Sequence, residues 1–147
     1  MLRVAKDLEV LMSLHDEWAA AILNRTKRWE FRRRCGLCPG MRVWIYVTAP
    51  CREIVGFFTV GEIRRVSAYY PEPGLARAGK VTPTRLREYF EGLDSGFAIE
   101  VTRPQRLRYG VCLARGKSGP MSYRFLDPTG RDRRLVRRLA DAAPPSA

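Results

Sequence analysis

A ten-residue stretch near the start of the chain carries an unusual density of side chains that can do chemistry. It reads RTKRWEFRRR over residues 25–34, with six basic residues and a single acidic one. Lysine and arginine hold phosphates or base edges. A carboxylate accepts hydrogen bonds from the amino group of a base, or it orients an arginine through a bidentate pair. The stretch predicts a nucleic-acid-binding site whose candidate residues are Lys27, Arg28, Glu30, Arg32 and Arg33.

The spacing within this stretch indicates which side chains act together. Residues 28–32 alternate, with the aromatic residues on one face and the charged residues on the other, which is typical of a β-strand. Lys27 lies just before this strand, at a corner between a helix and the strand. We therefore expect Lys27, Glu30 and Arg32 to line one cleft, while the two aromatic rings pack inside. In the alternative interpretation, Glu30 and Arg32 form an ion pair that only stabilises the fold.

Other residue types with catalytic or metal-binding potential are few. The four cysteines include a single Cys-x-x-Cys pair, Cys35 and Cys38, and the chain has one histidine, His15. A structural zinc site normally needs four such ligands, so we expect reduced thiols in a loop, with no metal and no other cofactor. A lone histidine is more often a capping or packing residue than a base. Metal-dependent cleavage would need clustered carboxylates, and Glu30 has no evident partner in the sequence.

The first half of the chain must position the basic stretch. The patterns predict a buried strand over 10–14 and a helix that Asp16 caps and that ends near Asn24. Strands over 42–49 and 53–66 follow, both rich in β-branched and aromatic residues. Gly56 predicts a bulge or sharp bend in the second of these strands.

The second half mixes loops, short strands and two helices. Residues 67–79 are expected to form a loop, and Thr82 followed by proline predicts the start of a helix whose buried face carries Leu86, Tyr89 and Phe90. Strands are expected over 96–104, 107–113 and 122–127, and an amphipathic helix is expected over 131–143.

This order of elements predicts an α+β fold. Short, mostly antiparallel strands with strong signals for curvature and few helices favour a small closed or half-closed β-barrel with helices at its ends. We expect one domain over residues 1–128, followed by a basic C-terminal extension over 129–147. Such a barrel leaves a cleft at its mouth in which a site can lie.

Positive charge is concentrated in two places. The formal net charge is +12, of which residues 25–34 contribute +5 and residues 131–138 contribute +4. This distribution favours RNA or another single-stranded nucleic acid as the partner. No apolar run approaches the roughly 18 residues that span a membrane, and the N-terminus lacks the apolar segment of a signal peptide, so a cytoplasmic protein without membrane partners is expected.

Several segments together resemble the ASCH domain, a relative of the PUA-like β-barrels. The hallmark of that family, GxKxxExR, corresponds here to RTKRWEFR over residues 25–32, and the segments PGMRVWIYVTAP, VGFFTVGEI and SYRFL also resemble the family over roughly residues 9–127. Arg25 occupies the place of the hallmark glycine, which suits a left-handed turn after the helix. Either Asn24 adopts that turn one residue earlier, or Arg25 adds a charge at the cleft mouth.

The resemblance implies a β-barrel with a cleft and binding of RNA or nucleotide-containing ligands. It adds three candidate residues: Thr48, at the end of a strand that approaches the cleft, and Tyr123 and Arg124 in the closing segment. Binding of nucleic acid or of a modified nucleoside is the function that we expect. The alternative is an enzyme, either a nuclease or an amidohydrolase acting on nucleosides, and a regulatory partner protein without a ligand is a third class.

The residues of this chain match only part of the catalytic set that some members of the family use. The acetylcytidine amidohydrolases in this family use a lysine, a threonine and a glutamate. The lysine is similar to Lys27, but Glu30 occupies the threonine position and the glutamate position falls near Gly79 or Lys80. That activity is therefore not carried over to this chain.

Overall fold

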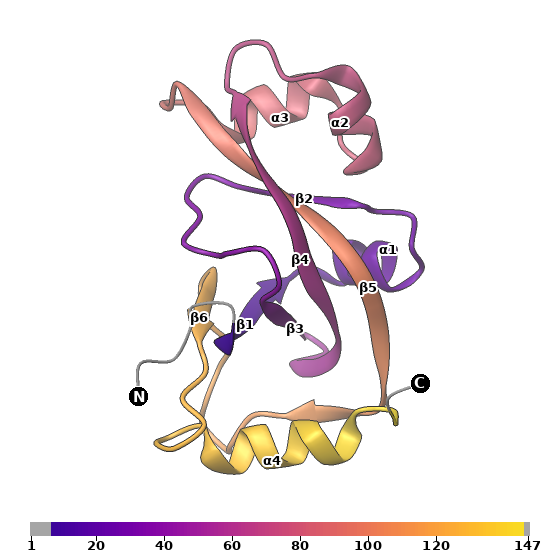
Figure 1. Ribbon diagram of the computed structural model, residues 1–147, viewed down its shortest axis with the longest axis vertical. Coiled ribbons are helices and arrows are strands. Elements are labelled where there is room, and N and C mark those ends of the chain that lie inside the picture. The colour runs from indigo at the N-terminus through magenta and orange to yellow at the C-terminus, as the bar shows by residue number, and fades with distance from the viewer. Residues whose placement is uncertain (1–6, 146–147) are drawn as a thin grey trace.

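A computed structural model describes residues 7–145 of the chain (Figure 1). Its elements, in order, are β1 (Glu9–Leu14), α1 (Asp16–Leu23), β2 (Trp29–Arg32), β3 (Arg42–Val47), β4 (Glu53–Ser67), α2 (Pro73–Ala78), α3 (Pro83–Tyr89), β5 (Ser95–Cys112), β6 (Tyr123–Phe125) and α4 (Arg133–Ala142).

The strands form one mixed sheet that curls into a half-barrel. Their order is β2-β5-β4-β3-β1-β6. The β1–β3 pair is parallel and the other four pairs are antiparallel. Figure 1 shows the long strands β4 and β5 crossing the molecule, with α2 and α3 near one end and α4 at the other. This arrangement confirms the α+β fold and the small barrel of mostly antiparallel strands with helices at its ends.

Curvature arises from irregular pairing in the two long strands. The register of β4 against β5 shifts three times, the first time between Ile54 and Gly56, where a bulge was predicted. A Cβ atom at Gly56 would lie 2.6 Å from the side chain of Leu23, so glycine lets α1 approach the sheet closely. The two strands expected over 96–104 and 107–113 form the single strand β5, because the chain bends at register shifts instead of leaving the sheet.

The residues at the helix ends differ from the expected ones at two positions, both next to α1. His15, and not Asp16, is the N-cap residue of α1. The turn after this helix is left-handed at Arg25, with φ of 64°, whereas Asn24 has φ of −83°. Arg25 therefore adopts the conformation of the hallmark glycine itself. At α3 the expected cap is confirmed, because the Thr82 side chain accepts a hydrogen bond from the Arg85 backbone.

The expected loop over residues 67–79 contains a short helix, α2, that sequence patterns did not indicate. Two prolines and two glycines in this segment argued against a helix, but Pro73 stands in the first turn, where a missing N–H costs nothing. Gly79 ends the helix and lies against β2, because a Cβ atom there would overlap the ring of Phe31.

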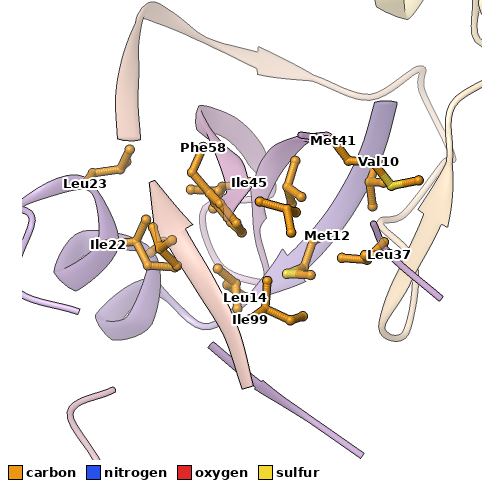
Figure 2. Packing of buried hydrophobic residues seen from close by; sticks show 14 of the residues in the cluster. Val10, Met12, Leu14, Ile22, Leu23, Leu37, Met41, Ile45, Phe58 and Ile99 are labelled. Atoms are coloured by element: carbon orange, nitrogen blue, oxygen red, sulfur yellow. The ribbon is translucent and has the colours of Figure 1, made fainter. Parts of the chain in front are cut away.

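Buried side chains form three clusters around the sheet. The largest contains residues of β1, α1, β3, β4 and β5, and Figure 2 shows Val10, Ile22, Ile45, Phe58 and Ile99 pointing into it. This cluster fixes the relative positions of α1 and β1, which both contribute to the site described below.

The C-terminal helix belongs to the fold. Its residues Leu135, Leu139 and Ala142 are buried in the second cluster, together with Trp44 and Ile54 of the sheet. The basic extension expected over 129–147 therefore includes a helix that packs onto the barrel, and we expect its removal to lower the stability of the domain. No helix within residues 7–145 has the length and apolarity that crossing a bilayer requires.

Candidate functional site

A pocket of about 430 Å³ opens between α1, β2 and α3. The volume lies within the range of roughly 300–1,000 Å³ that is common for small-molecule sites. The residues that line it are Ser13, Leu14, His15, Trp18, Lys27, Glu30, Phe31, Arg32, Thr48, Val81, Arg85, Leu86, Tyr89 and Met121.

Lys27 lies at the bottom of this pocket and not at its mouth. Its side chain is only 3% exposed, and its ammonium group donates a hydrogen bond of 2.5 Å to the carbonyl oxygen of Gly79. The rings of Trp18 and Phe31 stand 5.0 and 5.5 Å from the ammonium nitrogen. Burial lowers the pKa of Lys27 against the opposing attraction of Glu30. The lysine is therefore easier to deprotonate than an exposed one.

Glu30 presents a buried carboxylate without a hydrogen bond. Its Oε2 atom is 3.9 Å from the ammonium nitrogen of Lys27, and its Oε1 atom is 3.6 Å from Nε of Arg32. Both distances satisfy an ion pair but exceed a hydrogen bond. Within the described residues, the buried Oε2 atom has no hydrogen-bond donor. The carboxylate of Glu30 therefore keeps hydrogen-bonding capacity that its two ion pairs do not use.

Arg32 connects the two open edges of the sheet. It projects from the edge strand β2, and its guanidinium donates to Ser122 Oγ at 3.1 Å and to the carbonyl oxygen of Ser13 at 3.3 Å. Ser13 belongs to β1, and Ser122 precedes β6 at the opposite edge. Arg32 therefore closes the half-barrel through side-chain contacts and also lines the pocket, while its Nε atom makes no hydrogen bond within the described residues.

The walls and rim of the pocket add aromatic and polar groups. The rings of Trp18, Phe31 and Tyr89 line it from three different elements. His15 and Thr48 lie at the rim, with 3.5 Å between the His15 Nδ1 and Thr48 Oγ1 atoms. Stacking surfaces beside charged donors and one free acceptor suit a flat, polar and partly anionic molecule.

Four of the eight residues that the sequence singled out line the pocket: Lys27, Glu30, Arg32 and Thr48. The other two candidates of the basic stretch, Arg28 and Arg33, do not. Arg28 is exposed outside the pocket, and Arg33 donates to the carbonyl oxygens of Tyr89 and Glu91 at the C-terminal end of α3.

The two candidates of the closing segment make contacts within the fold. The Tyr123 hydroxyl accepts a hydrogen bond from the backbone of Gly36 at 2.7 Å. Arg124 forms a bidentate pair with Asp132, at 2.8 and 2.9 Å, just before α4. Their hydrogen bonds hold the loop before β3 and the start of α4 in place, and neither residue lines the pocket.

Several lining residues were not predicted as site residues. Tyr89 was expected on the buried face of its helix, yet it is 42% exposed at the pocket, and the half-buried Trp18 lines the same pocket. No pattern in the sequence indicated Arg85 or Ser13 as a site residue, because each reaches the pocket only where α3 and β1 lie close to β2.

Metal ligands do not gather in this region. Over residues 7–145, no three His, Cys, Asp or Glu side chains lie together in a way that could hold a metal ion. Cys35 and Cys38 are free thiols in the loop before β3, and burial raises the pKa of Cys35.

Comparison with known proteins gives one curated relative. No family model matches the chain. The chain is 32% identical over 107 residues to an ASCH domain-containing ribonuclease from Zymomonas mobilis subsp. mobilis, and the match covers 68% of each protein.

Solved structures of ASCH from Zymomonas mobilis share the fold. The crystal structure of that protein superposes with a TM-score of 0.74 and 28% identity, covering 91% of this chain and 96% of that one. A mutant with alanine in place of a serine gives a TM-score of 0.76 with 27% identity, covering 88% and 95%. Together with the hallmark residues of β2 in their pocket, this similarity shows that the chain belongs to the ASCH domain family.

Proposed function

We propose that this protein binds single-stranded RNA and that the pocket receives one of its nucleotides. The observation that carries the proposal is the convergence of Lys27, Glu30 and Arg32 in a pocket with three aromatic walls. The name of the relative, a ribonuclease, supports RNA as the kind of ligand.

Each group in the pocket has a role in this binding. A base stacks between the rings of Trp18 and Tyr89, which any base can do because every base has a π face. The carboxylate of Glu30 lines the pocket and accepts no hydrogen bond from the described residues, so it receives an amino hydrogen of the base. Arg85, exposed at the rim, holds the neighbouring phosphate. The site therefore favours bases that carry an exocyclic amino group over uracil, which has none.

The test is the variant Glu30→Gln, which keeps the shape and replaces an acceptor with a group that also donates. Binding of the four nucleoside monophosphates is measured by calorimetry, alongside the melting temperature. We expect the preference among bases to change by about tenfold, since one good contact to a base is worth roughly 1–3 kcal/mol.

Glu62→Gln is the matched control, because Glu62 is an exposed carboxylate on β4 that pairs with Arg64. It should leave base preference unchanged. If Glu30→Gln lowers the melting temperature and leaves all four affinities unchanged, Glu30 is a structural partner of Arg32 and the proposed role of the pocket is wrong.

Ribonucleolytic cleavage is a second candidate function. It is favoured by the lowered pKa of Lys27 beside Glu30, and by the name of the relative. In such a cleavage the 2′-oxygen attacks the phosphorus and the bond from phosphorus to the 5′-oxygen breaks. A base in the pocket, Glu30 or neutral Lys27, takes the 2′ proton, and His15 at the rim protonates the leaving oxygen.

Cleavage is tested with an RNA oligonucleotide and its counterpart that has a single 2′-deoxy linkage. We expect cleavage to stop at the deoxy linkage, and His15→Ala to slow cleavage by roughly 10²-fold or more. Equal cleavage at both linkages would exclude this chemistry. The amidohydrolase alternative has less support, because the backbone carbonyl of Gly79 contacts Lys27 where those enzymes use a glutamate.

A further inference from the structure

The outer face of α4 carries arginines whose side chains have no hydrogen-bond or ion-pair partner among the described residues. Leu135, Leu139 and Ala142 face the core, so helical periodicity turns Arg133 and Arg137 outward, with Arg134 beside them. All three are exposed, and over residues 7–145 none of their side chains makes a hydrogen bond or an ion pair. We propose that this arginine face of α4, Arg133, Arg134 and Arg137, is a second binding site for the phosphates of an RNA strand, separate from the pocket.

The fold holds this face in a fixed orientation. Asp132, just before α4, is 3% exposed and accepts from both Arg124 Nη atoms and from the Asp127 backbone. The C-terminal end is fixed by β5, where Arg108 donates to the carbonyl oxygen of Ala143 at 2.9 Å. A rigid array of cations loses less entropy on binding than a flexible tail does.

The charge balance of the helix also favours a polyanion. The only acidic residues over 131–142 are Asp132 and Asp141. Asp132 is already paired with Arg124, and Asp141 has no basic group within 4.0 Å among the described residues. Arg133 and Arg137 stand one turn apart, about 6 Å along the axis. Successive guanidinium groups at this spacing can each hold a phosphate through two hydrogen bonds.

The structure distinguishes RNA from a membrane as the occupant. A basic amphipathic helix that binds a bilayer inserts its apolar face. In α4 that face is covered by the sheet residues Leu11, Trp44 and Ile54, so nothing apolar is left to insert. The assignment to RNA rests on the proposed function of the pocket, and the experiment below separates the two.

The pocket and the arginine face lie apart along the molecule. Figure 1 shows α3, which contributes Arg85 and Tyr89 to the pocket, and α4 at opposite ends of the long axis. A mononucleotide in the pocket has no phosphates left for α4, whereas a long strand can contact both. The arginine face should therefore affect the binding of long strands only.

The experiment compares Arg133→Gln/Arg137→Gln with Arg77→Gln/Arg87→Gln. Both double variants remove two exposed arginines from helices, and α2 and α3, which carry the second pair, lie at the other end of the molecule. Binding of a 20-nucleotide single-stranded RNA and of nucleoside monophosphates is measured between about 50 and 200 mM salt. For the α4 variant we expect roughly tenfold weaker binding of the long strand and a log–log salt slope smaller by about 1.4, because each lost phosphate contact on a single strand is worth about 0.7.

The outcomes separate the two proposals. Unchanged monophosphate binding in the α4 variant, with a smaller effect of the control pair on the long strand, supports the second site. If both double variants weaken the binding of the long strand equally, the effect comes from net charge alone, and the proposal of a second site is overturned. Binding of the wild type to phosphatidylserine vesicles, lost in the α4 variant while RNA binding persists, would overturn RNA as the occupant. If monophosphates do not bind but the long strand depends on α4, the pocket proposal fails and the arginine face stands.

Discussion

Lys27 and Glu30 show what burial does to an ion pair at the scale of single residues. The two groups lie 3.9 Å apart and are nearly inaccessible to solvent, so each has lost hydration that the other restores only in part. Burial outweighs the attraction at Lys27 and lowers its pKa. Burying the ammonium group of Lys27 in the pocket costs hydration free energy, and a ligand that contacts this group can restore part of it.

The variant Lys27→Met tests this at the residue scale. The ordinary pKa of lysine, 10.5, applies to the unfolded chain, and the folded pKa is lower. Between these two values the unfolded state binds more protons, so the contribution of Lys27 to stability rises as the pH increases through this window. The stability of the wild type relative to the variant should therefore rise as the pH increases towards 10.5, as measured by urea unfolding.

Lys117→Met serves as the control, since Lys117 is exposed in the loop between β5 and β6. Its stability difference from the wild type should not change with pH. Parallel curves for the wild type and Lys27→Met would mean that Lys27 is not desolvated.

At the scale of elements, α4 is the helix whose observed role differs most from the role expected from the sequence. In the sequence it was expected as an amphipathic helix, with four arginines, within a basic extension of the domain. In the structure its apolar face completes the second cluster, and Asp132 connects its first turn to β6 through Arg124. The helix therefore serves as part of the core on one face and as a charged surface on the other.

Packing of this helix is tested by Leu139→Ala. Leu139 is 1% exposed, and truncating a buried leucine costs about 2–5 kcal/mol through lost burial and a residual cavity. We expect a loss in the free energy of unfolding within that range. Val136→Ala, at a half-buried position of the same helix, should cost clearly less. If both variants lose an equally small free energy of unfolding, α4 does not unfold together with the rest of the domain.

The connection at Asp132 gives a second prediction for this element. Burial raises the pKa of Asp132, but the hydrogen bonds from Arg124 and the Asp127 backbone outweigh it, so the pKa stays below its ordinary 3.8. A lowered carboxyl pKa contributes stability above the unfolded value, and this is lost as the pH falls through the folded value. Asp132→Asn should therefore cost about 2 kcal/mol near neutral pH.

The difference between Asp132→Asn and the wild type should shrink below about pH 4, as followed by thermal unfolding. Asp141→Asn, an exposed carboxyl on the same helix, is the control and should change stability little at any pH. A loss for Asp132→Asn that does not vary with pH would show that shape, and not charge, determines the contribution of Asp132.

At the scale of the whole molecule, the half-barrel is closed by side chains where backbone pairing stops. Strands β2 and β6 are the two edges of the sheet. Arg32 and the hydrogen bond from Gly36 to Tyr123 connect the two edges. This closure leaves the pocket open beside the connection, within a surface of high positive charge.

The net charge of +12 leads to a prediction about the complete molecule. If about four to six phosphates of a single strand are contacted, the log–log slope of affinity against salt should lie near −3 to −4. Fluorescence anisotropy with a labelled RNA over a range of salt concentrations measures it. An uncharged nucleoside, which fits the pocket alone, is the control and should show almost no slope. Salt-independent binding of the RNA would exclude an electrostatic interface.

Local patterns in the sequence were sufficient to predict most of the elements, though not α2, and one half of the site. Alternation placed Glu30 and Arg32 on the same side of β2, the Thr82-Pro83 pair predicted the start of α3, and Gly56 marked a bulge. These predictions succeeded because each depends on backbone preferences and periodicity within a few neighbouring residues. The predicted helix and strand also gave the position of Lys27 at the corner between them.

Only the tertiary structure decided what surrounds these residues. Lys27 contacts Gly79, 52 positions away, and Arg32 contacts Ser122, 90 positions away. Such contacts depend on how the sheet curls and where α3 lands, which no local pattern encodes. For the same reason Arg33 and Arg124, basic residues like any other in the sequence, proved to hold helices in place. The sequence alone determined which side chains were available, and packing over long separations decided which of them share a pocket, because burial and partners are properties of the assembled chain.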